Sequence, residues 1–301
     1  MRYVDRVRRA VLRVLGPLLA FDARDGSRLS LAPLAWPAMR RVNQRRIRAR
    51  CMALWVSDGV AACRVLGRFK MYVQADDHAH AAHLMFDGYW EMPVTEVVAA
   101  LVRPGMVAVD AGANQGYYTL LLAELVGPDG RVHAVEPNPR MVALVGRSLA
   151  VNGLAGRVRL HAEALGGPVA RRVVLRVPEG TPSGAYVEDA GDAAGATVTR
   201  SLDAILGDGR LDFIKIDAEG SEMAIWEGMR GILGRGAPLI VVMEFLLDRA
   251  PDAAGFLDEV AGLGFTLSCV DARQGLRAVT AGEVLASAGD VEWMLVLRRG
   301  A

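Results

Sequence analysis

The sequence predicts an α/β protein built on a doubly wound, Rossmann-like parallel sheet. From residue 105 onward, short apolar runs of strand length alternate with longer runs of helical spacing. The first apolar run ends in "DAGANQG" (residues 110–116), a turn with two glycines. The chain has 301 residues, of which 52% are hydrophobic, so it can bury a sizeable core. These three features favour an open sheet with helices on both faces.

Seven apolar runs are expected as strands. They are Met106–Ala111, Arg131–Val135, Val158–Ala162, Phe213–Ile216, Leu239–Phe245, Thr266–Val270 and Trp293–Leu297. Helical spacing lies between most of them, at Tyr118–Leu125, Arg140–Val151, Ser221–Leu233 and Ala253–Leu263. Because strands and helices alternate, we expect the strands to run parallel.

Two segments depart from this alternation. Residues 1–92 are expected to form an N-terminal extension, or cap, ahead of a main domain at 93–301. The extension would hold a basic helix at 1–20, a second at 38–53, a hairpin at 63–74, and helical spacing from 75 that is broken at Gly88 and Pro93. Residues 169–200 are rich in Gly, Ala and Asp, which predicts an inserted hairpin or lid.

The charge pattern limits the partners. A formal net charge of +1 argues against a dedicated nucleic-acid binder, so no nucleic-acid partner is expected. Residues 1–50 hold thirteen arginines and three aspartates, which suits contact with an anionic membrane surface, a polyanionic partner or the acidic body of the protein itself. The oligomeric state stays open, with a homodimer as one alternative.

The cysteines and the hydropathy indicate a compartment. Three scattered cysteines form no disulfide framework, and no apolar run has the length of a transmembrane helix. We therefore expect a cytoplasmic location.

Acidic residues follow the expected strands where a ligand would bind. In an open parallel sheet, ligands lie beyond the carboxyl ends of the strands. Glu136 ends the second strand and can accept hydrogen bonds from ribose hydroxyls. Glu163 and Ala164 end the third strand at an adenine-like position, and Asp217 and Glu219 follow the fourth. The turn is G-x-x-x-G, which differs from the G-x-G-x-x-G of a dinucleotide site.

One lysine lies inside an expected strand. Lys215 shares a strand face with Asp217, because side chains alternate along a strand. A salt bridge or a snorkelling side chain would explain it, and so would a charge that orients Asp217 or the substrate.

Residues from about Gly88 to Phe245 resemble the FkbM family of S-adenosylmethionine-dependent methyltransferases. The matching segments are "DGYWE", "VDAGANQGYYTLLLAELVG", "GRVHAVEPNPR", "HAEAL", "SLDAIL", "DFIKIDAEGSE" and "PLIVVMEF". The resemblance implies a class I methyltransferase fold, S-adenosylmethionine as cofactor, and O-methylation of a hydroxyl on a sugar, glycan or natural-product acceptor.

The resemblance also implies roles for individual residues. The implied cofactor contacts are Glu91, Asp110, Gly112, Asn114, Gly116, Glu136, Glu163, Ala164 and Asp217. The first strand end would wrap the methionine part and the ribose, Glu136 would take the ribose hydroxyls, and Glu163 and Ala164 would border adenine. Asp217 would lie near the methionine amino group and the point of methyl transfer.

Catalysis of methyl transfer calls for a group that takes the hydroxyl proton. We favour a carboxylate-centred site at Asp217 and Glu219, with His78 or His80 of "DDHAHAAHL" as the alternative base. Solvent-facing or capping roles, or a zinc site, would also explain these histidines. No metal is expected, although Asp217, Glu219 and Glu244 offer oxygen ligands for Mg²⁺ as an alternative.

Other functions stay open at this point. They are a nucleotide-dependent oxidoreductase, a methyltransferase acting on nucleic acid or another small molecule, and a non-catalytic module that binds S-adenosylmethionine. The missing G-x-G-x-x-G argues against the first.

Overall fold

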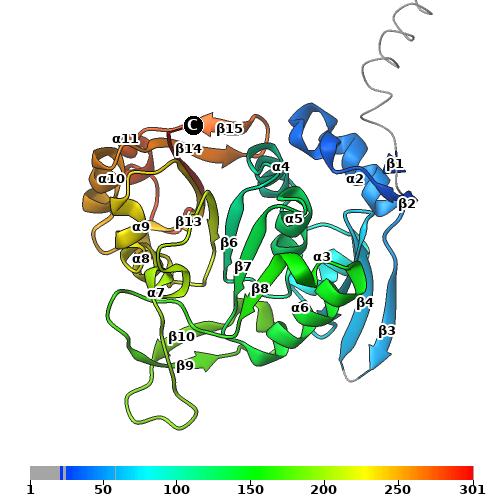
Figure 1. Ribbon diagram of the computed structural model, residues 1–301, viewed down its shortest axis with the longest axis horizontal. Coiled ribbons are helices and arrows are strands. Elements are labelled where there is room, and N and C mark those ends of the chain that lie inside the picture. The colour runs from blue at the N-terminus through cyan, green and yellow to red at the C-terminus, as the bar shows by residue number, and fades with distance from the viewer. Residues whose placement is uncertain (1–20, 23–24, 58, 301) are drawn as a thin grey trace, which may run out of the picture.

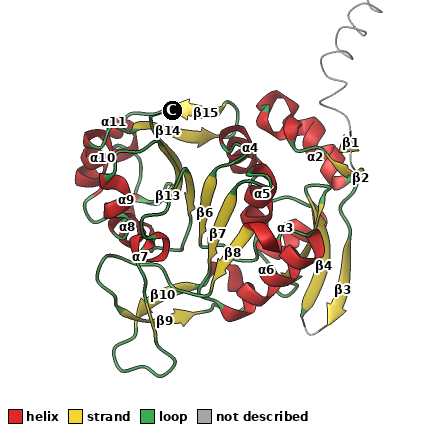
Figure 2. Cartoon of the chain, in the orientation of Figure 1, coloured by secondary structure: helices red, strands yellow, loops and turns green. Residues whose placement is uncertain are grey.

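An eight-stranded sheet forms the centre of the structure, a computed structural model that describes residues 21–22, 25–57 and 59–300 (Figures 1 and 2). In spatial order, the strands are β15 (Gly275–Ala278), β14 (Thr266–Asp271), β16 (Trp293–Arg299), β13 (Leu239–Phe245), β12 (Phe213–Ile216), β6 (Val107–Ala111), β7 (Arg131–Val135) and β8 (Val158–His161). All seven expected strands are present within about two residues of their expected bounds.

The directions of the strands confirm the doubly wound sheet. β8, β7, β6, β12 and β13 run parallel, as expected. The expectation was wrong for β16, which runs antiparallel to both β13 and β14. The chain builds outward from β6 through β7 to β8, then returns to the other side of β6 with β12 and β13. The switch point therefore lies between β6 and β12, where such sheets bind their ligands.

Helices cover both faces of this sheet. One side holds α4 (Met92–Leu101), α5 (Tyr117–Leu125) and α6 (Pro139–Asn152), and the other holds α7 (Leu202–Leu206), α8 (Glu222–Glu227), α9 (Arg230–Gly234), α10 (Ala253–Gly262) and α11 (Ala281–Leu285). Successive strand residues alternate between the two cores, so Phe213 packs with the first set and Ile214 with the second. The central strands are buried on both faces, which explains their continuous apolar sequences.

The N-terminal segment packs on the first of these cores. Its elements are β1 (Phe21–Asp22), β2 (Asp25–Leu29), η1 (Ala32–Ala35), η2 (Pro37–Met39), α2 (Arg40–Arg48), β3 (Ala53–Ser57), β4 (Val60–Val65), β5 (Phe69–Gln74) and α3 (His80–Phe86). Val65 and Phe69 of its three-stranded sheet share a hydrophobic cluster with Leu120 and Leu121 of α5. The division between residues 92 and 93 stays a prediction.

Two expectations for this segment need correction, and one lies outside the described residues. The helix expected at 38–53 ends at Arg48, because the apolar and aromatic residues of β3 pair with β4 instead. The expected hairpin at 63–74 is confirmed by β4 and β5. Pro93 does not break a helix; it lies in the first turn of α4, where its missing N–H removes no helical hydrogen bond. The helix expected at 1–20 falls on residues that the structure does not describe.

The inserted segment between β8 and β12 forms a small sheet of its own. It contains β9 (Arg172–Arg176), η4 (Pro182–Gly184), β10 (Tyr186–Asp189) and β11 (Thr197–Val198), in the order β10-β9-β11. Figure 1 shows β9 and β10 beside one end of the large sheet. Two further 3₁₀ turns are η3 (Ala155–Arg157) and η5 (Leu247–Arg249).

The sequence predicts a single helix at 221–233. The structure shows two helices there, α8 and α9.

No helix among the described residues has both the length and the apolar sequence needed to cross a lipid bilayer.

Gly112 provides a test of the packing at the switch point. It adopts φ 82°, and a Cβ placed on it would overlap the backbone oxygen of Asp217. We expect Gly112→Ala to lower the free energy of unfolding by about 2–4 kcal/mol, from the strained φ and the forced separation of β6 and β12.

Gly146 of α6 is the matched control, since a Cβ there meets no atom within 4 Å. Gly146→Ala should raise the free energy of unfolding by about 0.5–1 kcal/mol. Urea denaturation followed by circular dichroism measures both changes, and equal effects of the two substitutions would contradict the packing described here.

Candidate functional site

A cavity of about 300 Å³ opens at the switch point of the sheet. Its walls come from the carboxyl ends of β6, β7, β8, β12 and β13, from the start of α5, and from the segment that contains Glu91. Residues 181–187 of the inserted segment line it as well. One cavity therefore collects residues that lie far apart in the sequence.

The turn after β6 is tied to the end of β7 through one carboxylate. The backbone N–H of Asn114 donates to Glu136 Oε2 at 2.7 Å, and that of Asn138 donates to Oε1 at 2.8 Å. Burial raises the pKa of Glu136 to about 7, and these two N–H groups oppose the rise. A buried carboxylate thus faces the cavity with its orientation fixed by the backbone.

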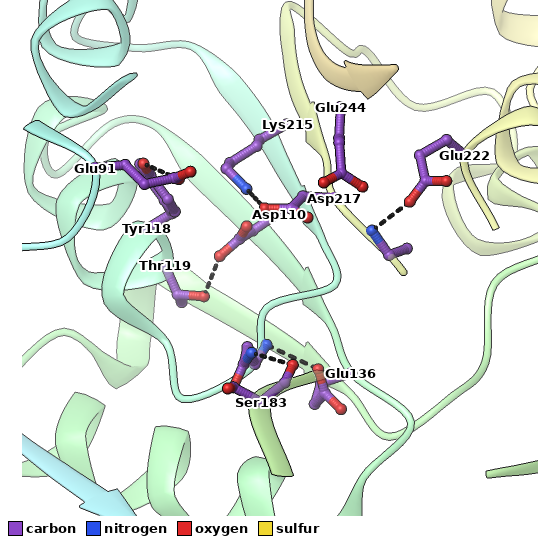
Figure 3. A network of polar contacts seen from close by, with 12 residues as sticks. Glu91, Asp110, Tyr118, Thr119, Glu136, Ser183, Lys215, Asp217, Glu222 and Glu244 are labelled. Carbon is purple, nitrogen blue, oxygen red and sulfur yellow. Dashed lines mark hydrogen bonds and ion pairs between the residues drawn. The ribbon is translucent and has the colours of Figure 1, made fainter. Parts of the chain in front are cut away.

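A buried ammonium group lies between the acidic residues of β6 and β12 (Figure 3). Lys215 Nζ donates to Asp217 Oδ2 at 2.6 Å and lies 4.5 Å from the centre of the Tyr118 ring. Burial lowers the pKa of Lys215, but Asp217, Asp110 and Glu91 outweigh it, so the pKa is raised and the group stays charged. Of the alternatives considered for Lys215, the structure shows the salt bridge to Asp217.

Asp110 supports this arrangement from behind the cavity wall. Its Oδ2 accepts a hydrogen bond from Thr119 Oγ1 at 2.6 Å, and the residue is 1% exposed. Burial raises the pKa of Asp110 to about 6, against the opposing charge of Lys215.

Backbone strain is concentrated around the cavity. Among the described residues, the non-glycine residues with positive φ are Leu66, Glu91, Asn114 and Glu219. The last three line the cavity. Left-handed backbone in non-glycine residues costs free energy and gathers at functional sites, so this distribution marks the cavity as a site.

The far side of the cavity carries more carboxyl groups. Glu244, at the end of β13, lines the cavity with Glu219 and Glu292. Burial, together with Asp217, Glu222 and Glu292, raises the pKa of Glu244 to about 9, although Arg249 Nη1 donates to its Oε2 at 3.0 Å. Glu244 therefore holds a proton more readily than an exposed carboxyl group does.

The same carboxyl groups bear on the question of a metal. Within the described chain, no group of three or more His, Cys, Asp and Glu side chains could hold a metal ion. The Mg²⁺ ligands considered from the sequence therefore find no support here.

Most of the residues singled out from the sequence meet in this cavity. The lining residues are His80, Glu91, Gly112, Asn114, Glu136, Glu163, Ala164, Asp217 and Glu219. Three others do not line it. Asp110 lies behind the wall, Gly116 begins α5 against Val145, and His78 is exposed, with its backbone N–H bonded to Gly180 O at 3.0 Å.

A polar cluster beside the cavity was not predicted from the sequence. Asp77 Oδ1 accepts hydrogen bonds from the backbone N–H groups of Ala79 and His80 and from Ser183 Oγ, and its Oδ2 accepts from Gln115 Nε2. Asn114 Nδ2 adds a bond to Ser183 O at 2.9 Å. An aspartate just before a helix is a common N-terminal signal, which would have drawn attention to Asp77. The contacts of Gln115 and Ser183 have no comparable local pattern.

Solved methyltransferase structures show limited similarity to this chain. A methyltransferase FkbM from Methylobacillus flagellatus is 18% identical, with a TM-score of 0.41, over 65% of this chain and 43% of the other. The O-methyltransferase TomG from Streptomyces achromogenes, solved with S-adenosylmethionine, is 17% identical, with a TM-score of 0.43, over 75% of this chain and 88% of the other.

Curated relatives match a shorter stretch. A protein-L-isoaspartate O-methyltransferase of Aeropyrum pernix is 43% identical over 58 residues, which are 19% of this chain and 22% of the relative. A protein of the same name from Methanothrix thermoacetophila is 42% identical over 48 residues. This chain thus matches about a fifth of the length of these relatives.

A family model gives the broadest match. Residues 110–267, just over half of the chain, match the methyltransferase FkbM domain. This range contains all five parallel strands that end at the cavity except the first residues of β6. The chain therefore belongs to the FkbM family of S-adenosylmethionine-dependent methyltransferases, as its motifs implied.

Proposed function

We propose that the protein transfers the methyl group of S-adenosylmethionine to a hydroxyl group of a sugar, glycan or natural-product acceptor. The observation that carries the proposal is the placement of Glu136. Its carboxylate is held by two backbone N–H groups at the end of the strand that follows the glycine turn. An acid at this point of a doubly wound sheet is the usual acceptor for ribose hydroxyls.

The residues of the cavity fit this cofactor. Gly112 lets the turn pack directly against the backbone of Asp217, and the packed turn lines the cavity. Ala164, Leu165 and Met141 offer an apolar site for a base. Asp217 and Glu91 suit the cationic methionine end, whereas the phosphates of a dinucleotide would be repelled by them.

The chemistry of the bound cofactor is that of a methyl group on a positively charged sulfur. The role of this chain is to hold the acceptor hydroxyl in line and to take up its proton. We assign the second task to the carboxylates of Asp217 and Glu219. Lys215 fixes the orientation of Asp217, and burial raises the pKa of Glu219, which makes its carboxylate the stronger base.

Two neighbouring groups suit this task less well. Glu244 already accepts a hydrogen bond from Arg249, so its carboxyl group is less available to the acceptor. His78 does not line the cavity.

The proposal is tested in two steps. Calorimetry should show binding of S-adenosylmethionine and S-adenosylhomocysteine but not of NAD. Methyl-tritiated S-adenosylmethionine is then incubated with a panel of glycosides, oligosaccharides and polyhydroxylated phenols, with their deoxy counterparts as controls. Label should enter only compounds that keep the free hydroxyl. Binding without transfer to any hydroxyl compound, together with transfer to an amine or to RNA, would overturn the choice of acceptor.

The pKa of Glu136 predicts a pH-dependent affinity for the cofactor. Only the ionised carboxylate accepts bonds from both ribose hydroxyls, and in the ligand-free protein its pKa lies at about 7. The affinity should therefore be constant well above pH 7 and fall below it, by at most about tenfold for each pH unit.

The variant Glu136→Gln should bind S-adenosylmethionine about 10- to 100-fold more weakly at pH 8, since a charged acceptor is lost. Its affinity should also lose most of the dependence on pH near 7. Calorimetric titrations of both proteins from pH 5.5 to 8.5 measure this, and parallel curves would show that another group is responsible.

The assignment of the proton acceptor is tested by substitutions that separate the carboxylates from the exposed histidine. Asp217→Asn keeps a hydrogen-bond acceptor for Lys215 but cannot take a proton, so kcat should fall by about 100-fold or more. His78→Ala should leave kcat unchanged. These rates require an acceptor found in the panel above, and the reverse pattern would assign the base to His78.

A further inference from the structure

His80 is a buried imidazole whose role the proposed function leaves open. It is the first residue of α3, it is 7% exposed, and its ring lies 4.7 Å from that of Trp90 in an edge-to-face arrangement. It also lines the cavity. The sequence left His80 as a candidate general base. Whether it can act as one depends on which ring nitrogen carries the proton.

The side-chain amide of Gln115 has only one orientation that satisfies its neighbours. The backbone N–H of Gln74 donates to Gln115 at 2.7 Å, which requires an oxygen, Oε1, at that position. The other atom is therefore the NH₂ group, Nε2. It donates to Asp77 Oδ2 at 2.9 Å and lies 3.4 Å from His80 Nδ1.

This orientation fixes the tautomer of His80. An NH₂ group can only donate, so His80 Nδ1 must accept with its lone pair. The proton of the neutral ring then resides on Nε2. Burial lowers the pKa of His80 to about 4, opposed by Asp217 and assisted by Lys215 and His83, so the ring is neutral at pH 7.

The N–H on Nε2 is a donor without a partner in the described part of the chain, and it belongs to a residue that lines the cavity. Nε2 is buried and has no hydrogen-bond partner among the described residues. The other buried side-chain atoms of the cavity lining that lack a partner there are Asn114 Oδ1 and Glu163 Oε2, which accept. Lys215 also lines the cavity, and the bond from its Nζ to Asp217 uses one of its three hydrogens. An anionic group entering this part of the cavity would find in His80 a buried side-chain donor with no other partner among the described residues.

We propose that His80 donates its Nε2 hydrogen to the carboxylate of the methionine end of the cofactor, and that it does not act as the base. This inference rests on the proposed function. In the proposed function, the adenine of the cofactor lies beside β8 and its ribose lies at Glu136. The methionine end of the cofactor then extends toward β6 and β12. His80 lies at that end, close enough to Lys215 and Asp217 to feel their charges.

The zwitterionic end of the cofactor then has a partner for each charge. Asp217 and Glu91 suit its ammonium group, and a neutral N–H donor suits its carboxylate. A donor without charge leaves the attraction between Lys215 and Asp217 undisturbed. To act as a base, Nε2 would have to take a proton from the hydroxyl of the methyl acceptor, but Nε2 already carries a hydrogen. That hydrogen cannot move to Nδ1, because Nδ1 faces the NH₂ group of Gln115.

The tautomer is measured on the ligand-free protein by long-range ¹H–¹⁵N NMR at pH 7. The His80 ring should show a protonated Nε2 and an unprotonated Nδ1. A proton on Nδ1, or on both nitrogens, would overturn the proposal without any variant. This measurement needs no cofactor, so its result is independent of the test of the proposed function.

The ligand contact is measured by calorimetry with S-adenosylmethionine and with its decarboxylated analogue, which keeps the sulfonium and the amine. His80→Phe should weaken binding of S-adenosylmethionine by about tenfold or more and leave binding of the analogue unchanged. His80→Gln, which keeps an N–H donor, should restore part of the loss. Equal weakening of both ligands by His80→Phe would overturn the proposal.

His83→Phe is the matched control. His83 lies on the same helix, also contacts Trp90, and its side chain is 60% exposed and outside the cavity lining. Both ligands should bind this variant as they bind the unaltered protein. If the unaltered protein binds neither ligand, the proposed function fails, whereas the NMR result for His80 stands by itself.

Discussion

The site depends on the close approach of β6 and β12 at Gly112. The two strands pair in parallel, with Asp110 opposite Lys215, and at the next residues the turn passes over the backbone of Asp217 with no room for a side chain. This contact sets the position of the turn, and the turn sets the backbone N–H that holds Glu136. A shift of one strand would therefore displace the carboxylates at three strand ends together.

The electrostatics of the cavity follow from this packing. Burial raises the pKa of several carboxyl groups that gather around a single ammonium, that of Lys215. Carboxyl groups crowded into a poorly solvated space disfavour the entry of further negative charge, such as a phosphate, and favour a ligand with positive charge. The positively charged sulfur and amine of the proposed cofactor match that environment. The left-handed backbone at Glu91, Asn114 and Glu219 fixes these cavity residues before the ligand binds.

Much of this site could be predicted from the sequence, because it follows from short-range rules. Apolar runs located the strands, and the residues that follow parallel strands must meet at one edge. Lys215 and Asp217 were placed on one strand face because strand side chains alternate, and the structure shows them bonded to each other. The cluster of Asp77, Gln115 and Ser183 could not be predicted, since it joins segments 38 and 106 residues apart through contacts that leave no periodic pattern. The strand β3 was also missed, because its pairing with β4 outweighs the helical spacing of the preceding residues.

The most direct test of the account is a crystal structure of the protein with S-adenosylhomocysteine. The account predicts the ribose hydroxyls on the Glu136 carboxylate, the base beside Ala164 and Leu165, and the sulfur facing Asp217. A ligand whose ribose lies away from Glu136, or that occupies another part of the molecule, would contradict it.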